Sequence, residues 1–440
     1  MIKKALTFIF LIIGFLSFSQ TNSPYSYFGM GDVAENEYTF NTLMGGAGVA
    51  YSDSAKVNRL NPASLSRLSN TVLHTGVAYK GVNLKTNDKT QQYGDGWLPY
   101  FGIGFPVLKN KLGFSGGLSP LSSSNFTIVD SIYEPNVGDV SYLHTGSGRY
   151  YQAFYDMGLQ LLPKKWSTKH RMSIGFGGAY YFGSMERQTR TEFNDTLYFF
   201  NSRRIEQSYL NDFYWHSGIH YNLNFSEKED KHMQFGMGFC WDNGKNLKVN
   251  RNIYWDRYQY NNTSIDIKDT VQITSEQSGS IYYPEGFSIG LSLSRISKLN
   301  LGKITQWHLF VDYKNRKWSN YKYFNESINL NDSYQISIGA QASPKTANQT
   351  KPLHFYFGGY FGEEYLFVKN QKVSSFGMSF GIGVPFKELP GKPGNSSILN
   401  IGLTLGKRGN KDIGIIEEQF IKINLGILMN SRWFIKRKFI

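Results

Sequence analysis

Residues 399–406 read LNIGLTLG, and the side chains of this stretch alternate between two kinds. Leu399, Ile401, Leu403 and Leu405 occupy every second position, with Asn, Gly, Thr and Gly between and after them. Successive side chains of a β-strand point to opposite faces. The stretch therefore predicts a strand with one apolar face and one small or polar face.

The same alternation recurs in three further segments: IKINLGILM at 421–429, FGMSFGIGV at 376–384 and FSIGLSL at 287–293. In a water-soluble β-sandwich the outward face normally carries Lys, Glu, Thr and Gln, whereas the second face here is mostly Gly, Ser and Asn. A transmembrane barrel reverses the requirement, because its apolar face contacts lipid and its small or polar face lines the interior. The pattern favours the membrane barrel over the sandwich.

The composition agrees with a strand-rich chain and excludes several other classes. The 440 residues include 33 Phe, 30 Tyr and 45 Gly, and only 18% are charged, compared with roughly 25% in an ordinary soluble domain. Cys240 is the only cysteine, which excludes an intrachain disulfide scaffold. Beyond residue 20 no stretch approaches the ~20 apolar residues of a membrane-spanning helix. The apolar content also excludes a disordered chain.

Fourteen segments have strand character, and we expect an all-β fold, a 14-stranded antiparallel transmembrane outer-membrane β-barrel. They lie at 70–82, 97–107, 110–119, 149–162, 170–187, 206–223, 231–241, 283–296, 304–315, 333–343, 353–361, 373–385, 396–407 and 416–429. The links after even-numbered segments are short. Those after odd-numbered segments are longer on average, and 242–282 is the longest. Short periplasmic turns and longer outer loops are typical of such barrels.

The beginning of the chain predicts export. Lys3 and Lys4 precede a short apolar core at 5–18, and small residues at 17 and 19 suit a cleavage site before Gln20. We therefore expect a cleaved signal peptide at 1–19, since the core is short for an uncleaved membrane anchor. No cysteine follows the cleavage point, so the mature chain is not expected to be a lipoprotein. The expected location is the outer membrane.

Residues 20–69 show no strand alternation and are rich in Gly, Ala and Ser. This segment is either a periplasmic extension or a hatch inside the barrel. A hatch is favoured, because an empty fourteen-stranded barrel would leave a wide aqueous hole. The expected organisation is a hatch at 20–69, a barrel at 70–430 and a basic, aromatic periplasmic tail at 431–440.

The short turns and the tail carry much of the positive charge of this chain, whose formal net charge is +14. The cations there are Lys109, Lys111, Lys164, Lys165, Lys169, Arg171, Arg295, Lys298, Lys303, Lys345 and Lys351, followed by the tail SRWFIKRK at 431–438. Contact with anionic lipid head groups is one explanation for this basic rim. The other is a docking surface for periplasmic or outer-membrane protein partners. Nucleic acid is not an expected partner of an exported chain.

The stretch MGGAGVA at 44–50, with Asp53 and NPASL at 61–65, is similar to the N-terminal motif of the FadL/TodX family of outer-membrane transport proteins. NSPYS at 22–26 and WFIKRK at 433–438 resemble the branch found in Bacteroidota. The hatch motif residues are Gly45, Gly46, Gly48, Asn61, Pro62 and Ala63. The resemblance implies a fourteen-stranded barrel, an N-terminal hatch and passage of hydrophobic molecules. It also implies an inward kink in the third strand that opens the wall sideways to the membrane.

The third predicted strand offers a candidate for such a lateral gate. Gly116 and Gly117 lack the side chains that stiffen a strand, and Pro120 has no amide proton for the ladder. Tight packing of hatch against wall explains the same residues. In the longest loop, a ligand or partner contact is expected at Arg251, Tyr254, Trp255, Arg257 and Tyr258. An arginine there suits a carboxylate, although exposed aromatic loops also bind proteins.

No catalytic site, cofactor or metal site is expected. Residues 113–117 match the G-x-S-x-G pattern, but Ser115 lies within a predicted strand instead of at a strand-to-helix elbow. His216 and His220 on a strand lie roughly 13 Å apart, too far to share an ion. An enzyme is thus a distant third possibility.

Two functions remain. The first is passive uptake of small hydrophobic compounds of the fatty-acid or arene class. The alternative is a non-transporting structural or docking subunit of an outer-membrane complex, in type 9 secretion or in the machinery that inserts outer-membrane proteins. The basic rim, the tail and the aromatic loops fit both.

Overall fold

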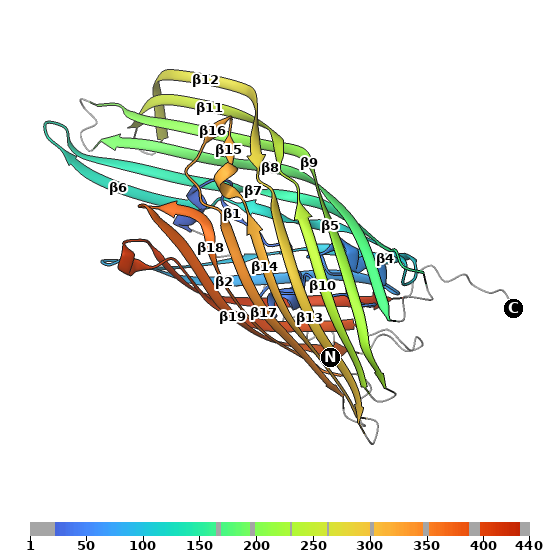
Figure 1. Ribbon diagram of the computed structural model, residues 1–440. Coiled ribbons are helices and arrows are strands. Elements are labelled where there is room, and N and C mark those ends of the chain that lie inside the picture. The colour runs from blue at the N-terminus through green and yellow to red at the C-terminus, as the bar shows by residue number, and fades with distance from the viewer. Residues whose placement is uncertain are drawn as a thin grey trace.

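The computed structural model describes residues 23–163, 169–193, 199–228, 231–261, 264–299, 303–345, 352–386 and 397–431. The chain forms a closed antiparallel barrel of 14 wall positions (Figure 1). β3 (Thr90–Trp97) and β4 (Phe101–Leu108) together occupy one wall position, beside β2 (Thr71–Lys85). The other wall strands are β5 (Leu112–Ser123), β7 (Gly138–Gln160), β8 (His170–Phe193), β9 (Asn201–Lys228), β10 (Lys231–Asp242), β13 (Gly286–Leu299), β14 (Lys303–Arg316), β17 (Ser333–Lys345), β18 (His354–Val368), β19 (Gln371–Phe386), β20 (Ser397–Arg408) and β21 (Glu417–Ser431). The predicted fold class is confirmed.

The barrel closes where its first and last wall strands pair. Thr71 of β2 lies opposite Ser431 of β21, and the register continues without a shift to Lys85 opposite Glu417. In the part of the chain that the structure describes, the wall strands have a neighbour on both sides except β3, which pairs with β2 alone. Outside that position, pairing on both sides leaves no free edge in the closed part of the barrel. Among the described residues, no helix has the length and apolarity needed to cross a membrane.

The apolar face of the alternating strands points outward. Ile401, Leu403 and Leu405 are exposed, as are Phe376, Met378 and Phe380. Their small or polar neighbours, such as Gly402, Thr404 and Ser379, are buried on the inner side. A contiguous band of exposed Leu, Ile, Phe and Met suits contact with acyl chains and not with water.

The remaining elements lie inside the barrel or beyond one of its ends. Those of the N-terminal part are η1 (Pro24–Tyr27), β1 (Asp32–Val33), α2 (Thr39–Thr42) and η2 (Pro62–Arg67). Those at the long-loop end are β6 (Phe126–Glu134), β11 (Lys245–Asn261), β12 (Ser264–Tyr283), η4 (Trp318–Asn320), β15 (Lys322–Tyr323), β16 (Glu326–Ser327) and η5 (Lys411–Ile413). Figure 1 shows the N-terminal elements, in blue, enclosed by the wall strands.

The segment 242–282 differs from the long loop that the sequence predicted. It contains β11 and β12, which pair with each other, while Val249–Tyr258 also pair with the outer half of β9. β6 pairs in the same way with the first half of β7. These strands extend the wall on one side of the barrel, as Figure 1 shows at the top. Both faces of β12 carry charged residues, so the alternation that identifies membrane strands is absent there.

Candidate functional site

The N-terminal segment, residues 23–69, lies in the lumen and contacts the wall all round through wall glycines. A Cβ atom at Gly175 would lie 2.1 Å from the Ala63 nitrogen, and one at Gly358 would lie 2.0 Å from the Met44 carbonyl carbon. Neither position has room for a side chain. The wall glycines that meet the segment in this way are Gly102, Gly104, Gly113, Gly158, Gly175, Gly218, Gly236, Gly238, Gly290, Gly339, Gly358, Gly381, Gly402 and Gly426.

The three motif glycines form the turn that follows α2. Gly45, Gly46 and Gly48 have φ angles of 67°, 76° and 140°, in the region that other residues rarely adopt. This turn presents two successive amide protons to one wall carboxylate. The Gly48 and Val49 nitrogens donate to Oδ2 of Asp312 on β14, at 2.6 and 2.8 Å. A buried carboxylate thereby ties the segment to the wall.

The second motif begins η2 and fastens it to another strand. Oδ1 of Asn61 accepts a hydrogen bond from the Ala63 nitrogen at 3.0 Å, which caps the helix, and Pro62 occupies its first turn. The Asn61 Nδ2 atom donates to the carbonyls of Val49 at 3.1 Å and of Ile219 on β9 at 3.0 Å. One side chain thus joins two parts of the N-terminal segment to the wall.

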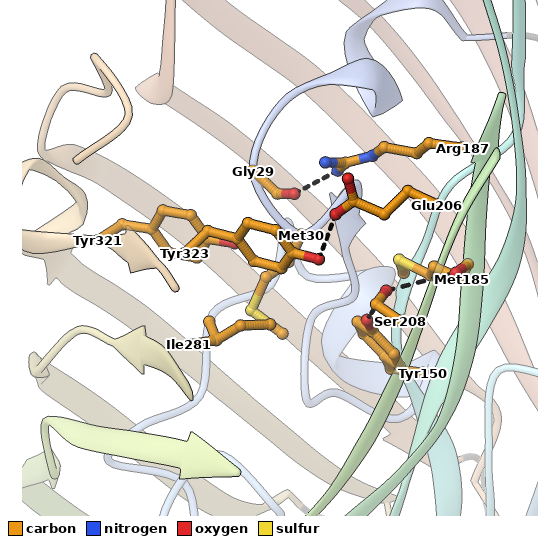
Figure 2. A pocket seen from close by; sticks show the side chains of 10 residues that line it. All are labelled: Gly29, Met30, Tyr150, Met185, Arg187, Glu206, Ser208, Ile281, Tyr321 and Tyr323. Carbon is orange, nitrogen blue, oxygen red and sulfur yellow. Dashed lines mark hydrogen bonds between the residues drawn. The ribbon is translucent and has the colours of Figure 1, made fainter. Parts of the chain in front are cut away.

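An apolar cluster closes the long-loop end of the lumen. Tyr25 and Met30 of the N-terminal segment pack with Trp318, Tyr321 and Leu330, which belong to the inward-folded loop 317–332. Figure 2 shows Met30 beside Tyr321 and Tyr323, with strands β7 to β9 on the other side. The space left between them is only about 10 Å³, enough for one water molecule at most.

Beside this cluster, Arg408 of β20 contacts three carboxylates, one from the N-terminal segment and two from the wall. Its guanidinium lies 2.8 Å from Asp32, 2.5 Å from Glu364 and 3.7 Å from Glu418. It also lies over the Tyr25 ring, 4.7 Å from the centroid. Since Arg408 is buried, removing it would leave carboxylates without their partner, which is costly in a low-dielectric interior.

Between the two ends lies a cavity of about 510 Å³, and its lining is strongly charged. Lys80 and Lys422 stand directly opposite each other in the β2–β21 pairing. The charged residues in the lining are Asp32, Glu35, Glu37, Arg59, Lys80, Asp95, Arg149, Asp242, Lys314, Arg316, Glu363, Glu364, Arg408 and Lys422. Burial raises the pKa of Glu37 above its usual range, although Lys314 and Lys422 act in the opposite direction. The lining also contains aromatic side chains such as Trp97, Phe154 and Tyr360. The charged groups among them set this cavity apart from the mostly apolar pockets that take apolar ligands.

The reactive residues considered from the sequence have structural partners. Nε2 of His216 lies 3.1 Å from Asp156, and Nε2 of His220 lies 2.9 Å from the Ala50 carbonyl. Ser115 is buried within β5, where no helix follows it. Cys240 is buried, with its Sγ 3.0 Å from the Leu60 carbonyl. Where side chains are described, no cluster of three or more metal-binding groups occurs.

The family model named BamG matches residues 1–440, the whole of the sequence. The chain belongs to the BamG family. Among curated proteins, none matches the sequence.

The barrel of this BamG-family chain is similar to three solved structures of transport proteins. A FadL homologue from Pseudomonas aeruginosa has a TM-score of 0.51 at 10% identity, covering 91% of this chain and 99% of the homologue. The CymD monoaromatic hydrocarbon channel has a TM-score of 0.50 at 12% identity, covering 91% and 98%. The toluene transporter TodX of P. putida has a TM-score of 0.48 at 10% identity, covering 91% and 100%. At these identities the similarity concerns the fold alone.

The third wall strand of this BamG-family barrel is interrupted beyond the two glycines. Gly116 and Gly117 pair on both sides, with Ile103 and Gly102 of β4 and with Tyr155 and Phe154 of β7. The register shifts between Pro120 and Ser122. The β4 pairing ends at Leu118, and β1 pairs with Ser122 and Ser123 instead. The cavity lining includes Trp97, Pro99 and Pro120 next to this gap between β3 and β5.

The five residues singled out in the long loop all lie on β11, but they have different surroundings. Tyr258 is buried and donates a hydrogen bond to Glu192 at 2.8 Å. Arg251 lies 3.8 Å from Glu206 and packs on the Phe324 ring. Tyr254, Trp255 and Arg257 are exposed. Only these last three are available to a ligand or partner outside the barrel.

Of the predicted basic rim, Lys109, Lys111, Lys169, Arg171 and Arg295 lie at the short-turn end. Lys298, Lys303 and Lys345 belong to strand ends at the same rim. Lys164, Lys165, Lys351 and residues 432–440 lie outside the described residues, as does the predicted signal peptide.

Asp312 and Arg408 were not singled out from the sequence, although both hold the N-terminal segment. For Asp312, the alternation of its strand could have indicated an inward-facing charge. Val311 and Tyr313 face outward, so alternation places Asp312 on the lumen face, where a charged side chain needs a partner. The partner itself, a pair of amides more than two hundred residues away, has no local signal in the sequence.

Proposed function

We propose that this chain is a closed, non-transporting barrel that serves as a docking subunit of an outer-membrane complex, of the kind that inserts outer-membrane proteins. Membership of the BamG family supports this function. The observations that carry it are the charged groups in the cavity lining and the packing of the N-terminal segment and the loop 317–332 across the lumen. A hydrocarbon gains roughly 0.8 kcal/mol per CH₂ by leaving water for an apolar site, and the ion pairs in this lining reduce that gain.

In this proposal residues 20–69 act as a permanent plug that stiffens the barrel. Residues 1–19 are a leader removed on export to the outer membrane, and 431–440 form a basic tail on the periplasmic side. The exposed residues Tyr254, Trp255 and Arg257 then serve partner contact outside the cell. The resemblance of both chain ends to Bacteroidota proteins supports a place for the chain in that branch.

The test is gentle extraction of the chain from its own outer membrane, followed by mass measurement of the purified particle. A docking subunit is expected in a stoichiometric complex much heavier than the 50.2 kDa chain, with the same partners in independent preparations. Recovery of the whole population as free chain under several mild detergents would contradict the proposal.

A second candidate function, uptake of small hydrophobic compounds, is favoured by one observation. The cavity reaches the interruption between β3 and β5, where Trp97 and Pro120 offer apolar surface and β1 occupies part of the gap. A lateral exit would lie here, three to four residues beyond Gly116 and Gly117. Saturable uptake of labelled fatty acid or toluene into proteoliposomes, lost on closing this gap with a disulfide, would support transport. No saturable component is expected if the barrel is a docking subunit.

A further inference from the structure

A compact group of cations lies at the short-turn end of the barrel, where the N-terminal segment meets the wall. Nη2 of Arg171 donates to the carbonyls of Ser66 and Asn110, each at 2.9 Å. Ser66 precedes Arg67 in η2, and Asn110 stands between Lys109 and Lys111 in the β4–β5 turn. One guanidinium therefore gathers cations from three separate parts of the chain.

The same junction is reinforced by backbone hydrogen bonds. The Asn110 nitrogen donates to the Leu68 carbonyl at 3.0 Å, which joins the end of the N-terminal segment to the turn. The Lys169 carbonyl accepts from the Asn224 nitrogen at 2.9 Å, which fixes the start of β8 against β9. The five residues Arg67, Lys109, Lys111, Lys169 and Arg171 are called the basic cluster below. Because its backbone is fixed, the cluster is a preformed surface.

The centre of the cluster faces the mouth of the lumen instead of the lipid. Ser173 bonds to Ser66 at 2.8 Å, and Gly175 meets Ala63, so both point inward. Arg171 lies two residues before Ser173 on the same strand and therefore shares this inward face. Anionic lipid head groups contact the outside of a barrel wall, so they do not explain a cluster built across its mouth.

Among the side chains that the structure describes, no carboxylate lies within ion-pair distance of the cluster, and Asp53 attracts Arg67 from farther away. The ion pairs between described residues include none of its five members. Asp53, in the nearby part of the N-terminal segment, is bound to the Tyr51 hydroxyl at 2.9 Å and the Ala55 nitrogen at 2.8 Å. Lys109, Lys111 and Lys169 are exposed. The three lysines of the cluster thus form an exposed positive surface.

We propose that this basic cluster docks an acidic segment of a protein partner at the periplasmic mouth of the barrel. The inference rests on the proposed docking function and names the surface and the partner's chemistry. Short turns of outer-membrane barrels face the periplasm, which is the compartment where the partner would lie. Carboxylates of the partner pair with the three exposed lysines, while Arg67 and Arg171 supply the positive field at the centre.

The first experiment uses the purified full chain and a fluorescent octaglutamate peptide as the probe, with binding followed by anisotropy. The variant Lys109→Glu/Lys111→Glu/Lys169→Glu is expected to bind the peptide at least about tenfold more weakly. The matched control, Lys89→Glu/Lys248→Glu/Lys322→Glu, makes the same charge change at the opposite end of the barrel, where those lysines are exposed. The control is expected to bind as the wild type does. Equal loss in both variants, or none in the first, would overturn the proposal.

Anionic lipid is distinguished in the same assay. Nanodiscs of neutral lipid and of lipid with one third phosphatidylglycerol are expected to give the same peptide affinity. Loss of binding in the anionic nanodiscs would mean that head groups occupy the cluster, and it would overturn the proposal. In native membranes, a complex that survives the short-turn variant contradicts the docking surface alone, whereas a wild-type chain that purifies without partners contradicts the proposed function.

Discussion

At the scale of single residues, wall glycines allow the backbone of the N-terminal segment to pack directly against the wall. Gly175 admits the backbone of Ala63 because it has no Cβ, and the opposing atoms belong to backbone that cannot rotate away. Gly175→Ala is therefore expected to cost about 1–3 kcal/mol of stability or to displace the segment. Protease sensitivity of the segment and thermal unfolding in detergent both measure this.

Gly81→Ala is the matched control, because the nearest atom to its Cβ would be 3.8 Å away. It lies in a wall strand without a positive φ. This control is expected to change stability by less than ~0.5 kcal/mol. If both substitutions behave alike, close packing of the segment against the wall is not what holds it.

At Asp312 a side chain, and not its absence, holds the N-terminal segment, because the carboxylate accepts hydrogen bonds from two of its amides. Asp312→Ala leaves the buried Gly48 and Val49 amides without an acceptor, at a cost of about 1–3 kcal/mol each. Asp312→Asn retains one acceptor oxygen and is expected to lose about half as much. Urea unfolding of the three proteins gives the order wild type, Asn, Ala. An alanine variant as stable as the wild type would exclude this anchor.

Glu37 predicts a dependence of stability on pH. Burial raises its pKa in the folded chain, and its neighbours Glu35, Lys314 and Lys422 set the rest of the local charge. A carboxyl group with a raised folded pKa loses stability as pH rises from its unfolded pKa to its folded pKa. Glu37→Gln is therefore expected to match the wild type near pH 4 and to be more stable at pH 8. The reverse order at pH 8 would show that the ionised form is preferred.

At the scale of elements, the outer hairpin β11–β12 lies beyond the closed part of the barrel and pairs with the outer half of β9. Leu247 and Ile281 are opposite each other, so residues 248–280 can be replaced by an Asn-Gly turn. The shortened chain is expected to fold, with a melting temperature within about 5 °C of the wild type. Gel mobility with and without heating measures folding. A chain that no longer folds would show that the outer sheet supports the wall.

The sequence predicted the wall strands well, because lipid on one face and the N-terminal segment on the other impose a strict two-residue period. Ile401, Leu403 and Leu405 illustrate this, each exposed between buried neighbours. Strand β12 was missed because water contacts most of both its faces. Strand β11 has one largely buried face, but bulges break its two-residue period. The lost β3–β5 pairing, with β1 in its place, was also beyond prediction, since a two-residue strand has no period to read.

At the scale of the whole molecule, the N-terminal segment and the loop 317–332 pack across the lumen, and charged residues line the cavity that they leave. Asn61 and the motif glycines were foreseeable as contact points, because Asn-Pro and Gly-rich stretches mark turns and close packing. The carboxylates and arginines that receive them come from strands hundreds of residues away. The charged residues of the cavity lining come from many separate parts of the chain, so no sequence motif predicts them.

Electrical conductance of single barrels in a planar bilayer tests the closed lumen most directly. The wild-type chain is expected to produce no stable conductance steps, since the N-terminal segment and the loop 317–332 block both ends. A chain lacking residues 20–69, if it inserts, is expected to conduct as an open pore. Steady conductance by the wild-type chain would contradict the account, because ions would then pass where the wall glycines and the segment are in contact.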